Sequence, residues 1–249
     1  MIEIKPSIER VNIDNPASLI SIQKHVEKCG RVCYKSEHNI TENSFIPFIE
    51  MLKKKEHLSV LEHGTVYLTM PLDKYALNFF STNKYSRVVI FDSELCITTN
   101  LRVIYENNLE KILSYITAPT YHIKRETYNI VCSRVISQQF MRHRAFSFSQ
   151  ESQRFCNYNN EGKFGEDIYF IENKASKNPK YQAFLESCET LYKDLVKSGV
   201  KAEDARFVLP NSVKTEFYMT GFTDDWQDFK RKRAIPHAQE EIRMLAMQV

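Results

Sequence analysis

Apolar residues recur at helical spacing in the first part of the chain. Beyond Pro16, the apolar positions within 19–26 share one face of a helix, and Gly30 is expected to end that helix. A second helix is predicted over about 45–55, with Pro47 near the start of its regular part. Both stretches therefore predict amphipathic helices that bury one face.

A strand pattern then replaces the helical one. Over 65–70 polar and apolar residues alternate, which predicts a strand, and a helix is expected from Pro71 to Phe80. We interpret 71–120, which mixes short apolar runs with a helix-like LEKILSYI, as an insertion-like segment.

Helical patterns dominate the second half of the chain. A strand in HIKRETYNIVC is followed by a helix near Ser133, whose side chain can cap it. Residues 157–180 are expected to form a loop with one short strand. The clearest helix covers 184–196, and Gly199 ends it.

Further helices are predicted towards the C-terminus. A short one stops before Pro210, two follow over 213–221 and 224–233, and Pro236 opens the last. The whole pattern predicts a single domain over 1–249 of the α+β class, with a mixed sheet and flanking helices.

The composition narrows the class of protein. The 249 residues are 43% hydrophobic and 26% charged, which excludes a disordered or collagen-like chain. The net charge of +3 gives no argument for a nucleic-acid partner. The six cysteines are scattered, and no apolar run approaches the roughly 18 residues of a bilayer crossing. We expect reduced thiols, a cytoplasmic location and no membrane partner.

The densest group of chemically useful side chains lies in 139–154. There Arg142-His143-Arg144 ends a predicted helix and gives way to a serine-rich loop. Guanidinium groups, hydroxyls and backbone N–H donors in one place suit a phosphate-bearing ligand. The alternative is that the basic residues only complement a helix C-terminus and the serines only form a loop.

The spacing of this group carries a family resemblance. The motif resembles the signature of the flavin-dependent thymidylate synthases, the ThyX family. In that signature Arg-His-Arg is followed by seven residues and then Ser152, with Gln139 three residues before the first arginine and Arg154 two residues after the serine. HLSVLEH at 57–63, GRVCY at 30–34, and ARFVLP followed later by Arg233 and PHAQ are similar to other segments of that family.

The resemblance implies a ThyX-like fold and an enzyme, a methyltransferase. The implied reaction methylates dUMP at C5 to dTMP, with 5,10-methylenetetrahydrofolate as carbon donor and NADPH reducing a bound FAD. It also implies a homotetramer with active sites shared between subunits, and no metal. Anionic ligands with flat rings agree with guanidinium groups beside apolar walls.

The resemblance also assigns site residues. The nucleotide contacts are Gln139, Arg142, Gln150, Glu151, Ser152, Gln153, Arg154, Arg206 and Arg233. The FAD contacts are Cys33, His57, Ser59, Glu62, Arg142, His143, Arg144, Ser149, Asp228 and His237. Arg206, Arg233 and His57 are the catalytic candidates. An arginine beside N3 and O4 of the uracil would stabilise negative charge there and polarise the ring.

Each of these residues has a simpler interpretation. His57 and His63 could be helix-end or core histidines, and Glu62 could only pair with a lysine. The basic run 230–233 could be a solvated face or a nucleic-acid patch. Ser152 lacks the Ser-His-Asp grouping of a nucleophile, so we assign it to phosphate binding.

Several positions depart from the family pattern and motivate two alternatives. They are Ser149, Gln150, Phe155, Phe222, Asp224 and Asp228. The changes at Gln150 and Asp224 favour a related flavin enzyme that modifies the pyrimidine at C5 in another way, such as hydroxymethylation. The basic run 230–233 favours a non-catalytic nucleotide-binding or nucleic-acid-binding homologue, although nucleic acid is not the expected partner.

Overall fold

A four-stranded antiparallel sheet forms the centre of the computed structural model, which describes residues 1–158 and 167–249. Its strands, in spatial order, are β2 (Ser7–Val11), β6 (Arg125–Ser133), β9 (Lys214–Phe222) and β7 (Ser147–Gln150). The longest ladder joins β6 to β9, from Arg125 opposite Phe222 to Ser133 opposite Lys214.

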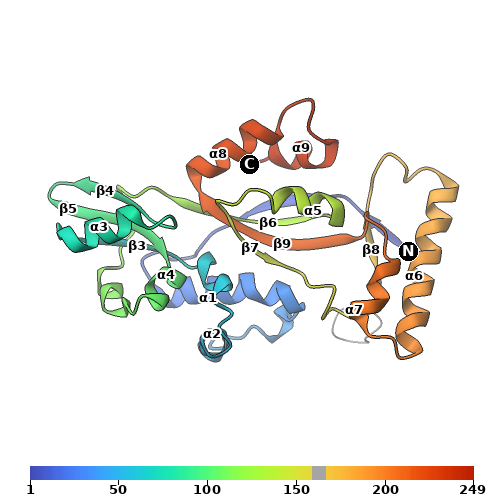
Figure 1. Ribbon diagram of the computed structural model, residues 1–249, viewed down its shortest axis with the longest axis horizontal. Coiled ribbons are helices and arrows are strands. Elements are labelled where there is room, and N and C mark those ends of the chain that lie inside the picture. Colours follow the sequence, from blue (N-terminus) through green and yellow to red (C-terminus); the bar gives the residue numbers. More distant parts are fainter. Residues whose placement is uncertain (159–166) are drawn as a thin grey trace.

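The two faces of this sheet are covered by different helices (Figure 1). One face carries α5 (Arg134–Phe140), α8 (Thr223–Arg233) and α9 (Glu240–Ala246). The other side carries α1 (Leu19–Arg31), α2 (Phe45–Lys54) and the 3-10 helix η3 (Leu58–His63). Short 3-10 turns η1 (Val32–Tyr34) and η2 (Glu37–Asn39) link α1 to α2.

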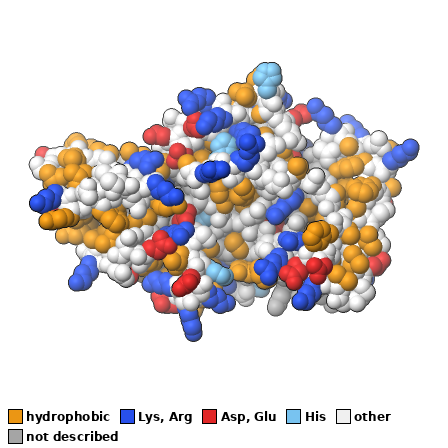
Figure 2. Space-filling model, in the orientation of Figure 1, with side chains coloured by type: hydrophobic (Ala, Val, Ile, Leu, Met, Phe, Trp, Pro, Cys, Tyr) orange, Lys and Arg blue, Asp and Glu red, His pale blue; other side chains and the backbone are white. Residues whose placement is uncertain are grey.

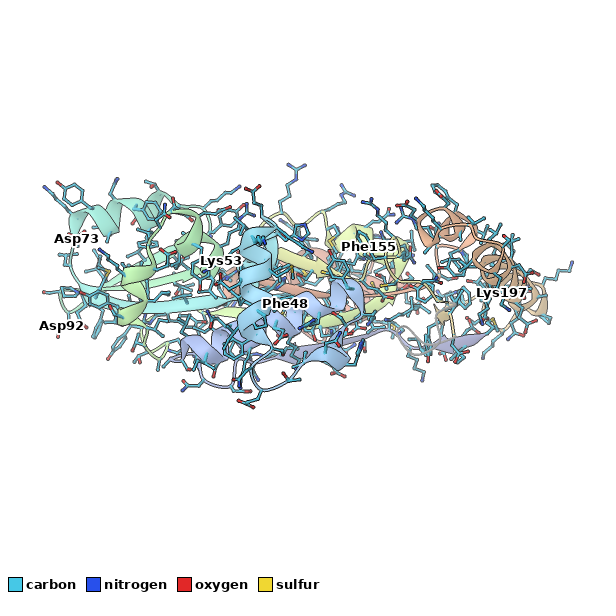
Figure 3. The ribbon with its side chains drawn as sticks, turned by 90° about the horizontal axis from the view of Figure 1, so that it is seen from below. Phe48, Lys53, Asp73, Asp92, Phe155 and Lys197 are labelled. Atoms are coloured by element: carbon cyan, nitrogen blue, oxygen red, sulfur yellow. The ribbon has the colours of Figure 1, made fainter. Side chains whose placement is uncertain are left out.

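Two smaller sheets extend the molecule at its ends. At one end β3 (Thr65–Pro71), β5 (Glu94–Asn100) and β4 (Arg87–Phe91) form an antiparallel sheet with α3 (Lys74–Thr82), α4 (Leu101–Glu106) and η4 (Glu110–Tyr115). At the other end β1 (Ile2–Ile4) pairs in parallel with β8 (Tyr169–Ile171), beside α6 (Pro179–Lys197), α7 (Ala202–Ala205) and η5 (Arg206–Val208). Figure 3 shows Asp73 and Asp92 at one end and Lys197 at the other.

Side-chain alternation divides the central sheet into an apolar and a polar face. Phe217 and Met219 of β9 and Ile130 of β6 pack with Phe140, Trp226 and Phe229 of the covering helices. The polar face, directed towards α1 and η3, carries the remaining alternate positions of β6, β9 and β7. They include Arg125, Thr127, Asn129, Ser147, Glu216 and Thr220. This face holds charged groups and hydroxyls that need partners, because buried polar atoms are stable only when hydrogen-bonded.

The segment 71–120 shares a hydrophobic core with the N-terminal helices. Phe80, Leu95 and Ile97 lie in one buried cluster with Ile22 of α1 and Phe48 of α2. The side of the molecule opposite α8 therefore has a continuous core that includes this segment.

The α+β class is confirmed, and most helix predictions agree with the structure. Asp73 caps α3 by accepting from the Ala76 N–H at 2.7 Å. Gly199 follows α6 at φ 94, the left-handed backbone that favours glycine after a helix. Gly30 is a correction: it lies inside α1, where an added Cβ would meet Phe48 and Val60 at 2.7 Å. Close packing, rather than helix termination, requires glycine there.

The prediction of a helix over 213–221 is wrong, because residues Lys214–Phe222 form the central strand β9. Its Lys-Thr-Glu-Phe-Tyr-Met-Thr sequence alternates between the two faces of the sheet, and both faces are buried. Because both faces are buried, the sequence shows no simple alternation of apolar and polar residues, and only pairing with the neighbouring strands distinguishes this strand from a helix.

Smaller corrections concern element ends. Ser133 precedes α5 but its hydroxyl does not cap the helix; it donates to Glu241 Oε2 at 2.8 Å instead. The last helix begins at Glu240 rather than at Pro236. The stretch LEKILSYI forms the 3-10 turn η4. The strands β1, β2, β4 and β5 had no sequence prediction, and β7 forms where a serine-rich loop was expected. The strand β8 is the short strand expected in 157–180; residues 159–166 of that stretch lie outside the described residues.

None of the helices in the described part combines the length and apolar character needed to cross a membrane.

Gly221 supplies a test of close packing in β9. An added Cβ would lie 2.4 Å from Cδ1 and 2.5 Å from Cε1 of Phe146. Gly221→Ala should therefore lower the free energy of unfolding by about 1–3 kcal/mol, measured by urea denaturation. In a Phe146→Ala background the added penalty should shrink, because the opposing ring is gone. An equal penalty in both backgrounds would contradict this explanation.

Candidate functional site

Arg233 joins the two helices on the apolar face of the sheet. At the end of α8, its Nε donates to His143 Nε2 at 2.9 Å, and its Nη2 donates to the Gln139 carbonyl at 3.2 Å. Phe140 of α5 stacks on Phe229 of α8 with ring centroids 5.2 Å apart, which holds the two helix ends together. Residues from two distant parts of the sequence thus meet directly.

Positive charge is concentrated around this contact. Burial, together with the nearby Arg233 and Lys232, lowers the pKa of His143 to about 4, so the imidazole is neutral and accepts from Arg233. Burial and then the nearby Arg142 lower the pKa of Arg233. Figure 2 shows Lys and Arg side chains gathered over α8 on this face. Converging like charges favour an anion as ligand.

Asp228 does not oppose this charge. Its carboxylate accepts from Arg231 and Lys232 of its own helix, each at 2.5 Å, and these cations lower its pKa. Two of the four cations in the run 230–233 are thus paired within α8, and Lys230 donates to the Val249 carbonyl at 2.7 Å. Arg233 is the member of the run that turns towards Gln139 and His143.

The serine-rich loop is held by backbone and buried ionic contacts. Ser152 N–H donates to the Cys33 carbonyl at 3.1 Å, which places Cys33 against the loop. Glu151 is buried and its carboxylate accepts from Tyr158 at 3.0 Å and from Lys214 at 2.8 Å. Its side chain therefore points into the protein. Its backbone N–H is also used, because it donates to the Glu216 carbonyl at 2.8 Å.

Lys214 is the centre of an ion-pair network behind this loop. Besides Glu151 it binds Glu216 at 3.1 Å, and Glu216 also accepts from Lys35 and from Asn129. Burial opposes ionisation of Glu216, but Lys214 and Lys35 hold its pKa down at about 2. A cavity of about 190 Å³ adjoins the network and is lined by Lys35, Glu151, Tyr158, Asp167, Tyr169, Val213 and Lys214. It does not include the candidate arginines.

Arg154 and Arg206 form a second cationic group. Arg154 Nε donates to Glu203 Oε2 at 2.9 Å, and Arg206 Nε donates to the Glu203 carbonyl at 3.0 Å. Glu203 is not among the site residues predicted from the sequence. Its position three residues before Arg206, in the turn that begins α7, is the signal that could have found it.

Glu62 is the most constrained of the candidate flavin residues. It is buried, and its Oε2 accepts from Ser147 at 2.6 Å while its Oε1 accepts from Arg102 at 2.7 Å. Its simpler interpretation gave a lysine partner, but the cation is Arg102 of α4. His57 and Ser59 are exposed at the start of the 3-10 helix that contains Glu62.

The remaining candidates lie around these groups. Gln150 donates to Thr215 at 3.1 Å, and Gln153 is buried with its Nε2 unpartnered within the described residues. Ser149 lies beside Cys33. Burial raises the pKa of the Cys33 thiol, and the hydrogen bond with Ser149 partly opposes this rise. Arg142, Arg144 and His237 are exposed. His63 is not at the surface but fully buried, as its simpler interpretation predicted.

The chain alone brings the candidates together only in part. Arg142 lies near Arg233, and Arg154 lies near Arg206, but among the described residues no hydrogen bond or ion pair joins the two pairs. The flavin candidates of η3 contact β7 through Glu62 and Ser147. In the described residues no group of three or more His, Cys, Asp or Glu side chains could hold a metal ion.

The fold and the site define an α+β protein that gathers guanidinium groups where two sheet-packed helices end. The family model described as "Thymidylate synthase complementing protein" matches residues 92–249, and the chain belongs to this family.

Curated relatives named flavin-dependent thymidylate synthase are similar to part of the chain. The protein of Thermococcus onnurineus is 37% identical over 119 residues, 46% of this chain and 48% of the relative. That of Pyrococcus furiosus is 34% identical over 158 residues, 60% and 64% of the two chains. That of Saccharolobus solfataricus is 39% identical over 114 residues, 46% and 43%. The matched part thus spans about half the length of most of these relatives.

The buried Lys214–Glu151 pair provides a stability test. Lys214→Met leaves the Glu151 carboxylate buried without its cation and should lower the free energy of unfolding by about 3–5 kcal/mol. Adding Glu151→Gln removes the uncompensated charge and should recover part of this loss in chemical denaturation. A double variant no more stable than Lys214→Met would show that charge burial is not the cause.

His143 provides a pH test. Its folded pKa of about 4 lies below the ordinary 6.5, so the unfolded chain binds the proton first. The stabilisation is complete above pH 6.5 and is lost as the pH falls towards 4. NMR titration of the imidazole should show Arg233→Met raising the pKa of His143, because a nearby cation is removed. The matched control Arg231→Met, a residue paired with Asp228, should change it much less; equal shifts would contradict the geometry.

Proposed function

We propose that this chain is a flavin-dependent thymidylate synthase with a ThyX-like fold. In the proposed reaction, the methylene carbon of 5,10-methylenetetrahydrofolate breaks its bonds to the folate nitrogens and bonds to C5 of dUMP, and the C5 hydrogen departs as a proton. NADPH supplies the two electrons, as hydride, that complete the methyl group through FAD. The products are dTMP, tetrahydrofolate and NADP⁺.

The contact of Arg233 with Gln139 and His143 carries this proposal. It joins the Arg-His-Arg motif to an arginine 90 residues later in the chain, with Arg142 close enough to lower the pKa of Arg233. A guanidinium held by neutral acceptors keeps its charge available for a ligand. Arg233 would stabilise negative charge on the uracil ring during carbon transfer.

The nucleotide phosphate would be bound at the serine-rich loop. The N–H groups of Glu151 and Ser152, expected as donors, donate instead to the carbonyls of Glu216 and Cys33. The remaining donors are the Ser152 hydroxyl and the buried Gln153 side-chain amide, whose Nε2 has no hydrogen-bond partner among the described residues. Arg154 and Arg206 supply positive charge, with Glu203 bridging them in the free chain. These donors suit a doubly charged phosphate ester.

The residues present fit a flavin. Asp228, which would repel a pyrophosphate, is neutralised by Arg231 and Lys232, and Arg142 and Arg144 are exposed. Phe222 offers no polar contact, because it is buried beneath Arg87, whose guanidinium lies 4.5 Å from the ring centroid. When bound, FAD would supply hydride transfer; His57, Ser59 and Glu62 would bind and orient it, with Cys33 and Ser149 at the loop.

Assembly would complete the site. Among the described residues no hydrogen bond or ion pair joins the Arg142–Arg233 pair to the Arg154–Arg206 pair, so we propose that copies of the chain contribute them to shared sites in a homotetramer. Light scattering on the purified chain should give the mass of four copies. A monomer that is fully active would overturn this arrangement.

The experiment that tests the function is product analysis. Purified chain with FAD, dUMP, 5,10-methylenetetrahydrofolate and NADPH should form dTMP. A hydroxymethyl nucleotide without dTMP would instead support the alternative C5 modification. Failure to bind FAD or dUMP would reject both enzymes.

Arg233→Ala should reduce turnover by at least about 100-fold, because it removes charge stabilisation that acts in the transition state. The matched control is Arg231→Ala, which removes the same charge from the same helix but faces Asp228. It should leave turnover within about twofold. Similar losses in both variants would contradict the role assigned to Arg233.

A further inference from the structure

Two threonine hydroxyls form a buried row across the polar face of the central sheet. Thr127 of β6 and Thr220 of β9 are register partners, and their Oγ1 atoms lie 2.7 Å apart. Thr220 is fully buried and Thr127 is 5% exposed. In such a site each hydroxyl needs partners, because a lost hydrogen bond leaves a buried polar atom unsatisfied.

Each end of the row binds a buried histidine. Thr220 Oγ1 lies 2.7 Å from Nδ1 of His63, in η3, and Thr127 Oγ1 lies 3.2 Å from Nε2 of His25, in α1. The thiol of Cys29 lies 3.6 Å from the same His25 nitrogen. The chain of contacts therefore connects α1 to η3 through two strands of the sheet.

Both histidines are neutral in this environment. Burial, with Lys28 and Arg125, lowers the pKa of His25 to about 4, and burial, with His25 and Arg125, lowers that of His63. A neutral imidazole can form a hydrogen bond with a hydroxyl, and no charge has to be buried for it. The row can therefore remain intact at neutral pH.

Neighbouring side chains on the same face of the sheet bind Glu62, the residue that precedes His63. Ser147, the register partner of Thr220 on β7, donates to Glu62 Oε2 at 2.6 Å. Arg125, two residues before Thr127, donates to the Glu62 carbonyl at 3.0 Å and to Thr65 Oγ1 at 3.2 Å. The end of η3 is thus attached to three consecutive strands.

We propose that Thr127 and Thr220 are positioning residues for the cofactor side of the site. Through His63 they hold the end of η3 against the sheet, so that the Glu62 carboxylate stays between Ser147 and Arg102 and the exposed His57 and Ser59 keep a fixed direction. This inference rests on the proposed flavin site at η3. Neither threonine contacts the ligand; each acts through His63.

Removal of one hydroxyl at constant shape tests the proposal. Thr220→Val keeps the volume but deprives His63 Nδ1 of its partner, whereas Thr220→Ser keeps the hydroxyl. The matched control is Thr99→Val in β5, because Thr99 is also fully buried and its Oγ1 binds Ser86 Oγ at 2.9 Å in the other sheet. FAD dissociation constants and thermal midpoints are measured for all three variants.

Thr220→Val should weaken FAD binding at least about tenfold, which corresponds to about 1.4 kcal/mol. Thr220→Ser should restore binding to within about threefold of wild type. Thr99→Val should lower the thermal midpoint but leave the FAD affinity within about twofold. Wild-type affinity in Thr220→Val, or an equal loss in Thr99→Val, would overturn the positioning role. If Thr220→Val does not fold, Thr127→Val takes its place, with the same expected and contrary outcomes.

Hydrogen exchange in the flavin-free protein separates this proposal from the function. Amides of 58–64 should exchange faster in Thr220→Val than in wild type or Thr99→Val, because η3 has lost its attachment. Unchanged exchange would overturn the attachment itself. If wild type binds no FAD, the proposed function and the cofactor role fail together, while faster exchange in Thr220→Val would still support the attachment of η3.

Discussion

The ladder between β6 and β9 is the constraint on which the rest of the structure depends. It pairs Ser133 with Lys214 at one end and Arg125 with Phe222 at the other. Because α5 follows the last residue of β6 and α8 follows the last residue of β9, the two helices start at opposite ends of one ladder and run along the same face. Their C-terminal ends meet, and this brings Arg233 to Gln139 and His143.

The same ladder sorts side chains by alternation, and this divides packing from polar chemistry. Phe217 and Met219 point towards α5 and α8, where aromatic rings fill the space. Glu216 and Thr220, just before and just after this pair, lie on the opposite face, where their partners are Lys35, which follows η1, and His63 of η3. A one-residue change of register would exchange the two sets, which makes the pairing strongly specified.

The sequence predicted which residues belong to the candidate site better than it predicted their contacts with one another. The spacing of Gln139, Arg142 and Ser152 identified the loop, because those positions follow one another in sequence. Glu203 and Arg102 were not predicted as site residues. Glu203 contacts Arg154 and Arg102 contacts Glu62, in each case across a long sequence separation. Arg154 and Arg206 meet at Glu203, and Arg142 lies near Arg233, but no hydrogen bond or ion pair among the described residues joins the two groups.

By itself, the sequence determined the α+β class, the helices with clear caps and one apolar face, such as α6, and the residues of the Arg-His-Arg motif. Those features depend on local spacing and on neighbours within a few residues. Only the tertiary structure decided that 214–222 is a strand, that Gly30 lies inside a helix and that Thr127 and Thr220 bind buried histidines. The physical reason is that strand pairing, close packing and buried hydrogen bonds join residues far apart in the chain, so local patterns cannot specify them.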